Sequence, residues 1–240
     1  MDKSTFGSVI DAVFKVLIDG SKKDYIGEKI SQLEHSLQAA NGALESNADD
    51  ETVLAALLHD IGQFVTSPDH KEMLFDAAAL TDLDPAAAAA AAAESSASVS
   101  GSTTAINLNT PNKKKISVGV TGHERIGAEY LRSLGFSEKV AVLVEAHVPV
   151  KRYLTGKYPE YYDGLSGASK LSLKYQGGPY TTKEVALFEK DPLFELKVQV
   201  RQWDDAAKVV DLKVPGLEYY RPMAIRHLEE QASNRCSVVV

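Results

Sequence analysis

Apolar residues recur at three- and four-residue intervals along most of the chain, the spacing that places them on one face of a helix. The first stripe holds Phe6, Val9, Ile10 and Val13, before the polar break at Asp19-Gly20-Ser21. Essentially no segment alternates between apolar and polar residues, so we predict an all-α fold. The pattern predicts helices over about residues 5–17, 24–39, 50–61, 122–132, 140–147, 166–175, 183–188, 192–210 and 217–230.

The third of these helices ends in an adjacent histidine and aspartate, His59 and Asp60. Asp49 or Asp50 supplies an N-cap, and Gly62 is expected to break the helix at its C-terminal end. Neighbouring residues on a helix point about 100° apart, so His59 and Asp60 can meet two metal ions, or one can bind a metal while the other supports it. Alone the pair is weak evidence, because a histidine on an apolar helix more often belongs to the core or to a cap.

The second predicted helix carries three polar side chains that could take part in chemistry, Tyr25, Glu28 and His35. At 3.6 residues per turn they fall within an arc of roughly 80°, so one helix face would present a phenol, a carboxylate and an imidazole. The alternative is a solvated helix edge with an incidental tyrosine.

The composition changes sharply between about residues 66 and 120, where eight consecutive alanines, Ala86 to Ala93, precede a serine-rich run. Such a segment cannot bury enough apolar surface to offset its ordering entropy. We interpret it as an insertion in a single domain of residues 1–240, mobile or partly helical at the alanines and without a catalytic residue.

Composition narrows the class of protein further. With 240 residues, 44% hydrophobic and 25% charged, the chain belongs to the soluble globular class. The net charge of -7 argues against a nucleic-acid partner, and the sequence has neither a membrane-spanning run nor a leader, so we expect a cytoplasmic protein. Because Cys236 is the single cysteine, a metal site must use His, Asp, Glu and Tyr, which favours iron, manganese or magnesium.

Six polar residues stand on predicted core-facing helices, in the chain order H, HD, H, H, D. Four imidazoles and two carboxylates, one of them able to bridge, suit a pair of iron ions held between helices. The six candidate metal ligands are His35, His59, Asp60, His123, His147 and Asp204.

Longer motifs surround these residues. They are Tyr25-Ile26-Gly27-Glu28, Leu57-Leu58-His59-Asp60-Ile61-Gly62, Gly122-His123-Glu124, Glu145-Ala146-His147, Leu165-Ser166-Gly167-Ala168-Ser169, Gln176-Gly177-Gly178-Pro179 and the run from Arg201 to Lys208. With them the sequence resembles the oxygenase branch of the HD-domain superfamily, specifically the organophosphonate oxygenases that cleave 2-amino-1-hydroxyethylphosphonate to glycine and phosphate. Myo-inositol oxygenase is a more distant relative.

The resemblance implies a mixed-valent Fe(II)/Fe(III) pair that works on a small organophosphonate with O2. It implies that Asp60 bridges the two irons, that Tyr25 occupies an iron position until substrate displaces it, and that Glu28 accepts the substrate ammonium. A carboxylate in a partly dry pocket gains most from such a cationic partner. The implied ligands of one iron are His35, His59, Asp60 and Asp204, and those of the other iron are Asp60, His123 and His147. The implied phosphonate-binding residues are Lys151, Ser169, Gln176 and Arg201.

One departure leaves the substrate open. The glycine-forming pattern reads His-Asp-Ile-Gly-His, whereas this chain has Gln63 in the last place, so a supporting imidazole is missing. A methylated ammonium is an alternative, recognised by cation–π contact with tyrosines. An HD-domain metal-dependent phosphohydrolase is the competing function, since the same ligands could activate water against a phosphate ester. The tyrosines available for the methylated ammonium are Tyr153, Tyr158, Tyr161 and Tyr162.

Overall fold

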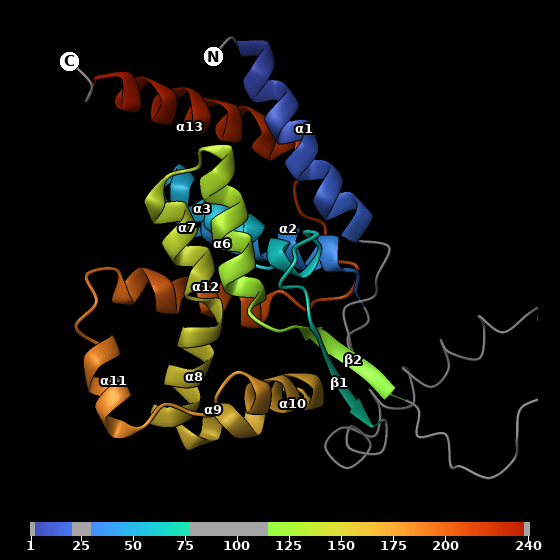
Figure 1. The fold of residues 1–240 in the computed structure, drawn as a ribbon, viewed down its shortest axis with the longest axis vertical. Helices are drawn as coiled ribbons and strands as arrows, with labels where there is room; N and C mark the ends of the chain where they lie inside the picture. The colour runs from blue at the N-terminus through green and yellow to red at the C-terminus, as the bar shows by residue number, and fades with distance from the viewer. Residues whose placement is uncertain (1–2, 21–29, 77–114, 238–240) are drawn as a thin grey trace, which may run out of the picture.

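The computed structural model describes residues 3–20, 30–76 and 115–237, and helices dominate this part of the chain (Figure 1). The predicted all-α class is confirmed, with one small two-stranded sheet beside it. No helix among the described residues is long and apolar enough to cross a membrane. In chain order the elements are α1 (Lys3–Gly20), α2 (Gln32–Glu45), α3 (Asp50–Leu58), the 3-10 helix η1 (Ile61–Gln63), β1 (Glu72–Asp76), β2 (Lys115–Val120), α6 (His123–Leu134), α7 (Glu138–Glu145), α8 (His147–Lys157), α9 (Pro159–Gly164), α10 (Gly167–Tyr175), α11 (Thr182–Phe188), α12 (Phe194–Ala206) and α13 (Leu217–Ser237).

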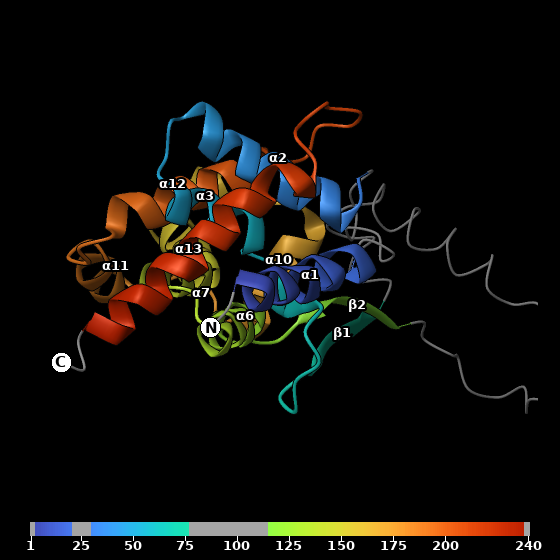
Figure 2. The same cartoon turned by 90° about the horizontal axis from the view of Figure 1, so that it is seen from above.

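Helix α3 is the centre of the packing. All its residues from Thr52 to Leu58 are buried, and it contacts α2, α7, α12 and α13. Asp49 caps the helix by accepting a hydrogen bond from the backbone N–H of Thr52 at 3.0 Å. Helix α13 passes over α3 and packs on α1 along one side of the molecule (Figure 2). The chain therefore leaves α3 in the protein interior, where His59 and Asp60 follow.

Helix α2 starts later than the periodicity predicts. Ser31 is its N-cap: the side chain accepts from the N–H of Glu34, and the Glu34 carboxylate accepts from the N–H of Ser31. The prediction of one helix from Asp24 to Ala39 was therefore wrong, because this reciprocal cap makes the helix begin at Gln32. Tyr25 and Glu28, and the helix face on which they were placed, lie outside the described residues.

We predicted that Gly62 ends α3, and this was wrong. The helix stops at Leu58, and Gly62 lies inside η1. Its role is close packing. A Cβ at this position would lie 1.9 Å from the carbonyl oxygen of His123 and 2.6 Å from the backbone nitrogen of Gly127. The glycine thus lets η1 rest directly on the backbone of α6, which brings Asp60 close to His123.

The predicted helix over 140–147 is also divided differently. Helix α7 ends at Glu145, Ala146 forms the junction, and His147 is the first residue of α8 rather than the last of α7. Pro149 sits in the first turn of α8, where no helix hydrogen bond to its nitrogen is needed. The junction turns the chain inside the protein and aims His147 at the ends of α3 and α12.

The interpretation of residues 66–120 was wrong at both ends of the segment. Glu72–Asp76 and Lys115–Val120 pair as antiparallel strands, which we call the β ribbon. Met73 and Val118 are buried and pack on Leu171 of α10. The alanine run lies outside the described residues. Contact with α10 supplies the apolar burial that the local composition lacks, so the ribbon is part of the folded body.

We predict that Gly62→Ala lowers the free energy of unfolding by about 3 kcal/mol, because the added methyl meets backbone atoms that cannot rotate away. The substitution should also reduce metal binding, since the displaced segment is the one that carries His123. Urea unfolding and metal content after loading measure the two effects.

Gly7→Ala is the matched control. A Cβ at Gly7, inside α1, meets nothing within 4 Å, so this change should raise stability by about 0.5–1 kcal/mol through helix propensity. Equal effects at the two glycines would contradict the packing argument for Gly62.

Candidate metal centre and adjoining cavity

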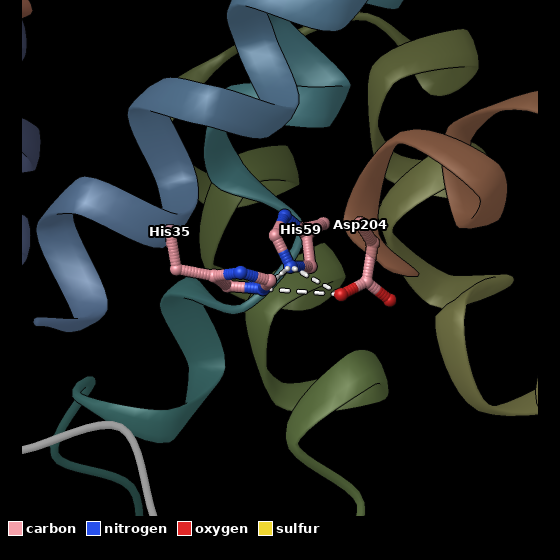
Figure 3. A group of neighbouring side chains, drawn as sticks. All are labelled: His35, His59 and Asp204. Carbon is pink, nitrogen blue, oxygen red and sulfur yellow. Dashed lines mark hydrogen bonds and ion pairs between the residues drawn. The ribbon is translucent and has the colours of Figure 1, made fainter. Parts of the chain in front are cut away.

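The six candidate ligands come from separate parts of the chain and converge in the interior. His35 projects from α2, His59 and Asp60 follow α3, and Asp204 projects from α12. His35, His59 and Asp204 point toward one another between these elements (Figure 3). His123 and His147, the first residues of α6 and α8, complete the group, and all six side chains are almost entirely buried.

Four of the residues surround one point. The Nε2 atom of His35 lies 3.0 Å from Oδ1 of Asp204 and 3.1 Å from Nε2 of His59. The Nε2 atom of His59 lies 3.5 Å from Oδ2 of Asp60 and 3.7 Å from Oδ1 of Asp204. Two imidazole nitrogens and two carboxylate oxygens therefore face a common centre.

Asp60 also faces a second group with its other oxygen. Oδ1 of Asp60 lies 3.4 Å from Nε2 of His123 and 3.8 Å from Nε2 of His147. Neither Oδ1 of Asp60 nor Nε2 of His123 has a hydrogen-bond partner among the described residues, although both atoms are buried. One carboxylate thus offers an oxygen to each of two neighbouring sets of imidazoles, which is the arrangement of a bridging ligand.

Backbone carbonyls orient three of the imidazoles. Nδ1 of His35 lies 2.8 Å from the oxygen of Ala207, and Nδ1 of His59 lies 2.8 Å from the oxygen of Ala56. Nδ1 of His123 lies 3.0 Å from the oxygen of Val120 at the end of the β ribbon. Donation from Nδ1 to a carbonyl leaves the Nε2 lone pair free for a metal, as is usual for metal-binding histidines.

The charges of the centre favour a cation. Burial alone would raise the pKa of Asp60, but the imidazoles around it hold that pKa well below its usual range. Burial likewise disfavours charge on Asp204, yet Arg201 and His147 hold its pKa well below normal. Burial lowers the pKa of His59, but Asp60 and Asp204 together raise it to about 9. A metal ion would therefore replace a proton at His59.

These observations fit a metal centre. The donor set is oxygen and nitrogen only, and the orphaned atoms of Asp60 and His123 are the ones that a second ion would satisfy. Two overlapping groups of residues each bring their ligand atoms within 4.8 Å of one another. One group is His35, His59 and Asp204, and the other is His59, Asp60 and His147. Such a set suits iron or manganese better than a structural zinc.

A cavity of about 80 Å³ opens directly onto Asp60, His123 and His147. Its cationic side holds Lys151 and Arg201, both buried. All four residues assigned to the phosphonate by resemblance line this one cavity, together with Ser166 and Ser172: Lys151, Ser169, Gln176 and Arg201.

Arg201 connects the cavity to the centre. Its Nη1 lies 2.8 Å from Oδ2 of Asp204, while Nη2 donates to Asp205 at 2.7 Å and Nε donates to the Tyr161 hydroxyl at 2.9 Å. The Tyr161 hydroxyl donates in turn to Asp205 at 2.6 Å. Tyr161 and Asp205 thus occupy one edge of the guanidinium, which orients the opposite edge toward Asp204 and the cavity.

The four tyrosines considered for a methylated ammonium have other partners and are absent from the described lining of this cavity. Tyr161 holds Arg201 as described, and Tyr153 packs between Phe188 and Phe194. Tyr158 and Tyr162 lie against the ammonium groups of Lys157 and Lys170. No Phe, Tyr or Trp side chain belongs to the described lining of the cavity.

Sequence reasoning missed several residues of the cavity wall. Gln32 lies three residues before His35 on α2, an i, i+3 spacing that could have signalled a shared face. The oxygen of its buried carboxamide has no hydrogen-bond partner among the described residues. Met73, Val118 and Gly119 belong to the β ribbon, in the segment that we expected to carry no functional residue.

Comparison with known proteins identifies the family. The HD domain matches residues 33–164, more than half of the chain. The chain belongs to the HD-domain family. It is 34% identical to a hydroxymethylphosphonate dioxygenase of Gimesia maris, over 90% of this chain and 86% of that protein. It is 29% identical to a glycine-betaine-forming 1-hydroxy-2-(trimethylamino)ethylphosphonate dioxygenase of Leisingera caerulea, over 96% of this chain and 95% of that protein.

An uncharacterized protein of Acanthamoeba polyphaga mimivirus is also 34% identical, over 88% of this chain and 78% of that protein. These relatives place this HD-domain chain in the phosphonate dioxygenase family, as the sequence motifs predicted. The HD match includes His35 through His147, whereas Asp204 and Arg201 lie beyond it. The HD unit thus receives its last candidate ligand, and a cavity cation, from α12.

We predict different effects for the two adjacent aspartates of α12. Asp204→Asn should reduce the amount of bound metal, because the Oδ1 atom of Asp204 faces His35 and His59. Asp205→Asn should leave metal content unchanged, because the Asp205 carboxylate binds Tyr161 and Arg201 instead. Metal analysis after anaerobic loading and desalting measures both. Full occupancy in Asp204→Asn would show that our choice of ligand is wrong.

Proposed function

We propose that this HD-domain protein is a dioxygenase that breaks the C–P bond of a 1-hydroxyalkylphosphonate. One O2 and the substrate account for all atoms of the products, which are a carboxylate, phosphate and a proton. The observation that carries the proposal is the cavity in which Lys151 and Arg201 face the same space as Asp60, His123 and His147. The similarity to enzymes named for two phosphonates supports it.

The cationic residues suit the phosphonate group. Lys151 and Arg201 would hold the dianion, because a buried ammonium and a guanidinium both gain from an anionic partner. Ser169 lines the same side, and Gln176 has a buried carboxamide oxygen without a hydrogen-bond partner among the described residues. Held there, the hydroxyl-bearing carbon would face the six ligands. The same cations would stabilise the charge that phosphate gains as the C–P bond breaks.

We propose two iron ions as the cofactor, a mixed-valent Fe(II)/Fe(III) pair, with Asp60 as the bridging ligand. His35, His59 and Asp204 would complete one site, and His123 and His147 the other. Bound iron would supply the activation of O2 and the positive charge that attracts the substrate hydroxyl. The protein would orient the substrate, keep the two carboxylates ionised and exclude bulk water from the reacting carbon.

The identity of the substrate depends on which group is attached to the hydroxyl-bearing carbon. The two named relatives differ in this group, which is a hydrogen in one name and a trimethylaminomethyl group in the other. From the resemblance we predicted 2-amino-1-hydroxyethylphosphonate, with glycine as product and Glu28 as the acceptor of its ammonium. That remains a prediction, since Glu28 and Tyr25 lie outside the described residues.

The test is oxygen consumption by iron-loaded protein together with phosphate release. Hydroxymethylphosphonate, 2-amino-1-hydroxyethylphosphonate and its N-trimethyl analogue serve as separate substrates. We expect one O2 consumed for each phosphate released with at least one of them. Lys151→Met should weaken phosphonate binding strongly because it removes a cation from the buried cavity.

A phosphohydrolase would give the opposite result. In that case iron- or manganese-loaded protein would release phosphate from phosphate monoesters without consuming O2, and hydroxyphosphonates would remain intact. This outcome would exclude the dioxygenase proposal while leaving the metal centre in place.

We predict that kcat/KM falls as pH rises above about 7. Burial and the neighbouring Arg201 together lower the pKa of Lys151 to about 7, against the opposing pull of Asp204 and Asp60. Above this pH the substrate-free protein loses the Lys151 proton, so each further pH unit should reduce phosphonate capture by up to about tenfold. In the complex the bound dianion keeps the lysine charged, so kcat should change less.

Lys151→Arg is the control for this pH effect, because a guanidinium keeps its proton throughout the range. Its kcat/KM, although lower at neutral pH, should decline less steeply above pH 7. Identical pH profiles in the two proteins would mean that another group is responsible for the decline.

A further inference from the structure

The residues that line the cavity divide by chemistry into three walls. Lys151 and Arg201 form the cationic wall with the polar residues of α10, and Asp60, His123 and His147 form the wall at the metal centre. The third wall carries no charge. It consists of Gln32, Gln63, Met73, Val118, Gly119 and Ala168.

The first two walls take the phosphonate and the hydroxyl of the proposed substrate. Its remaining group, the substituent on the hydroxyl-bearing carbon, is therefore left to the third wall. The cavity of about 80 Å³ has the volume of roughly three water molecules, at about 30 Å³ each. A phosphonate and a hydroxyl-bearing carbon fill most of that space, so the position of the third wall limits the size of the substituent.

The β ribbon supplies the apolar surface of this wall. Met73 and Val118 are buried and pack with Leu171, which lies on the same helix as Ser169 and Ser172. Leu74, the neighbour of Met73 on β1, is 44% exposed and belongs to the other face of the strand. The ribbon thus directs one face into the cavity.

Gln63 fixes the ribbon relative to the metal centre. Its Oε1 accepts a hydrogen bond from the N–H of Val120 at 2.8 Å, and the carbonyl of Val120 lies 3.0 Å from Nδ1 of His123. Gly119 has a φ of 111°, and a Cβ there would lie 3.1 Å from the Gln63 carboxamide. Both polar groups of Val120 are therefore held by residues of the cavity, so the ribbon cannot shift without disturbing His123.

We propose that the β ribbon determines substrate selectivity, with Met73 and Val118 setting the largest group that the hydroxyl-bearing carbon can carry. This inference rests on the proposed function for its substrate. It assigns a role to a segment whose local composition predicts no functional residue.

The test compares Met73→Ala with the wild type on an uncharged series: hydroxymethyl-, 1-hydroxyethyl- and 1-hydroxypropylphosphonate. The wild type should prefer the shortest member. In Met73→Ala, kcat/KM for the propyl member relative to the hydroxymethyl member should rise about tenfold or more, the range that one or two methylenes produce in an apolar pocket. Leu74→Ala removes an exposed leucine side chain from the same strand and should leave this ratio unchanged.

A second measurement separates the inference from the proposed reaction. Calorimetric binding of methyl-, ethyl- and propylphosphonate to anaerobic, metal-loaded protein should show the same change in size preference without turnover. If no hydroxyphosphonate is oxidised but Met73→Ala still relaxes this preference, the proposed reaction is wrong and the selectivity wall stands. Oxidation with an unchanged size preference in Met73→Ala overturns the inference alone.

Two further variants cover the case in which Met73→Ala does not fold. Val118→Ala removes less volume from the same wall and should change the preference in the same direction by a smaller factor. Met73→Leu keeps the volume and should keep the wild-type preference. A Val118→Ala protein with the wild-type preference overturns the inference.

Discussion

The Asp60 carboxylate is the group on which the rest of the structure depends. A buried, ionised carboxylate costs several kcal/mol unless charged or polar partners surround it. Here its two oxygens face different sets of imidazoles, with His59 on one side and His123 and His147 on the other. Because those residues come from the ends of α3, α6 and α8, a single carboxylate requires three helix ends to meet.

The way these helix ends meet explains much of the sequence around them. Asp49 caps α3 at its start, and Gly62 allows η1 to touch the backbone of α6. Arg201 then connects the centre to the cavity, since one guanidinium contacts Asp204 and also lines the space proposed for the phosphonate. The two roles of Asp204 use different oxygens, since Oδ1 faces His35 and His59 whereas Oδ2 binds Arg201.

The sequence predicted most helices, and the six ligands that it proposed converge in the structure, because both leave local signals. Helix periodicity is a short-range pattern, and the family motifs point to His59 or Asp204 without knowledge of their neighbours. The failures have two causes. Ser31 begins α2 through a reciprocal cap with Glu34, a local signal that the apolar spacing alone does not reveal. The other failure came from a contact distant in sequence. The β ribbon is stabilised by Leu171, about a hundred residues from Met73, so a composition argument confined to residues 66–120 could not find it.

Gln63 shows how one substitution in a motif can be understood from its contacts. By resemblance we expected an imidazole at this position and treated its absence as the loss of a supporting group. In this chain the carboxamide accepts from the N–H of Val120 and packs against Gly119, both on β2. A carboxamide also has a donor nitrogen, so it can bind the strand and still offer hydrogens to its other neighbours. Because Val120 also contacts His123, the residue at position 63 connects the cavity wall to the metal centre. Gln63 therefore has two contacts that matter for the cavity, since it lines the space itself and also holds the strand that forms the apolar wall.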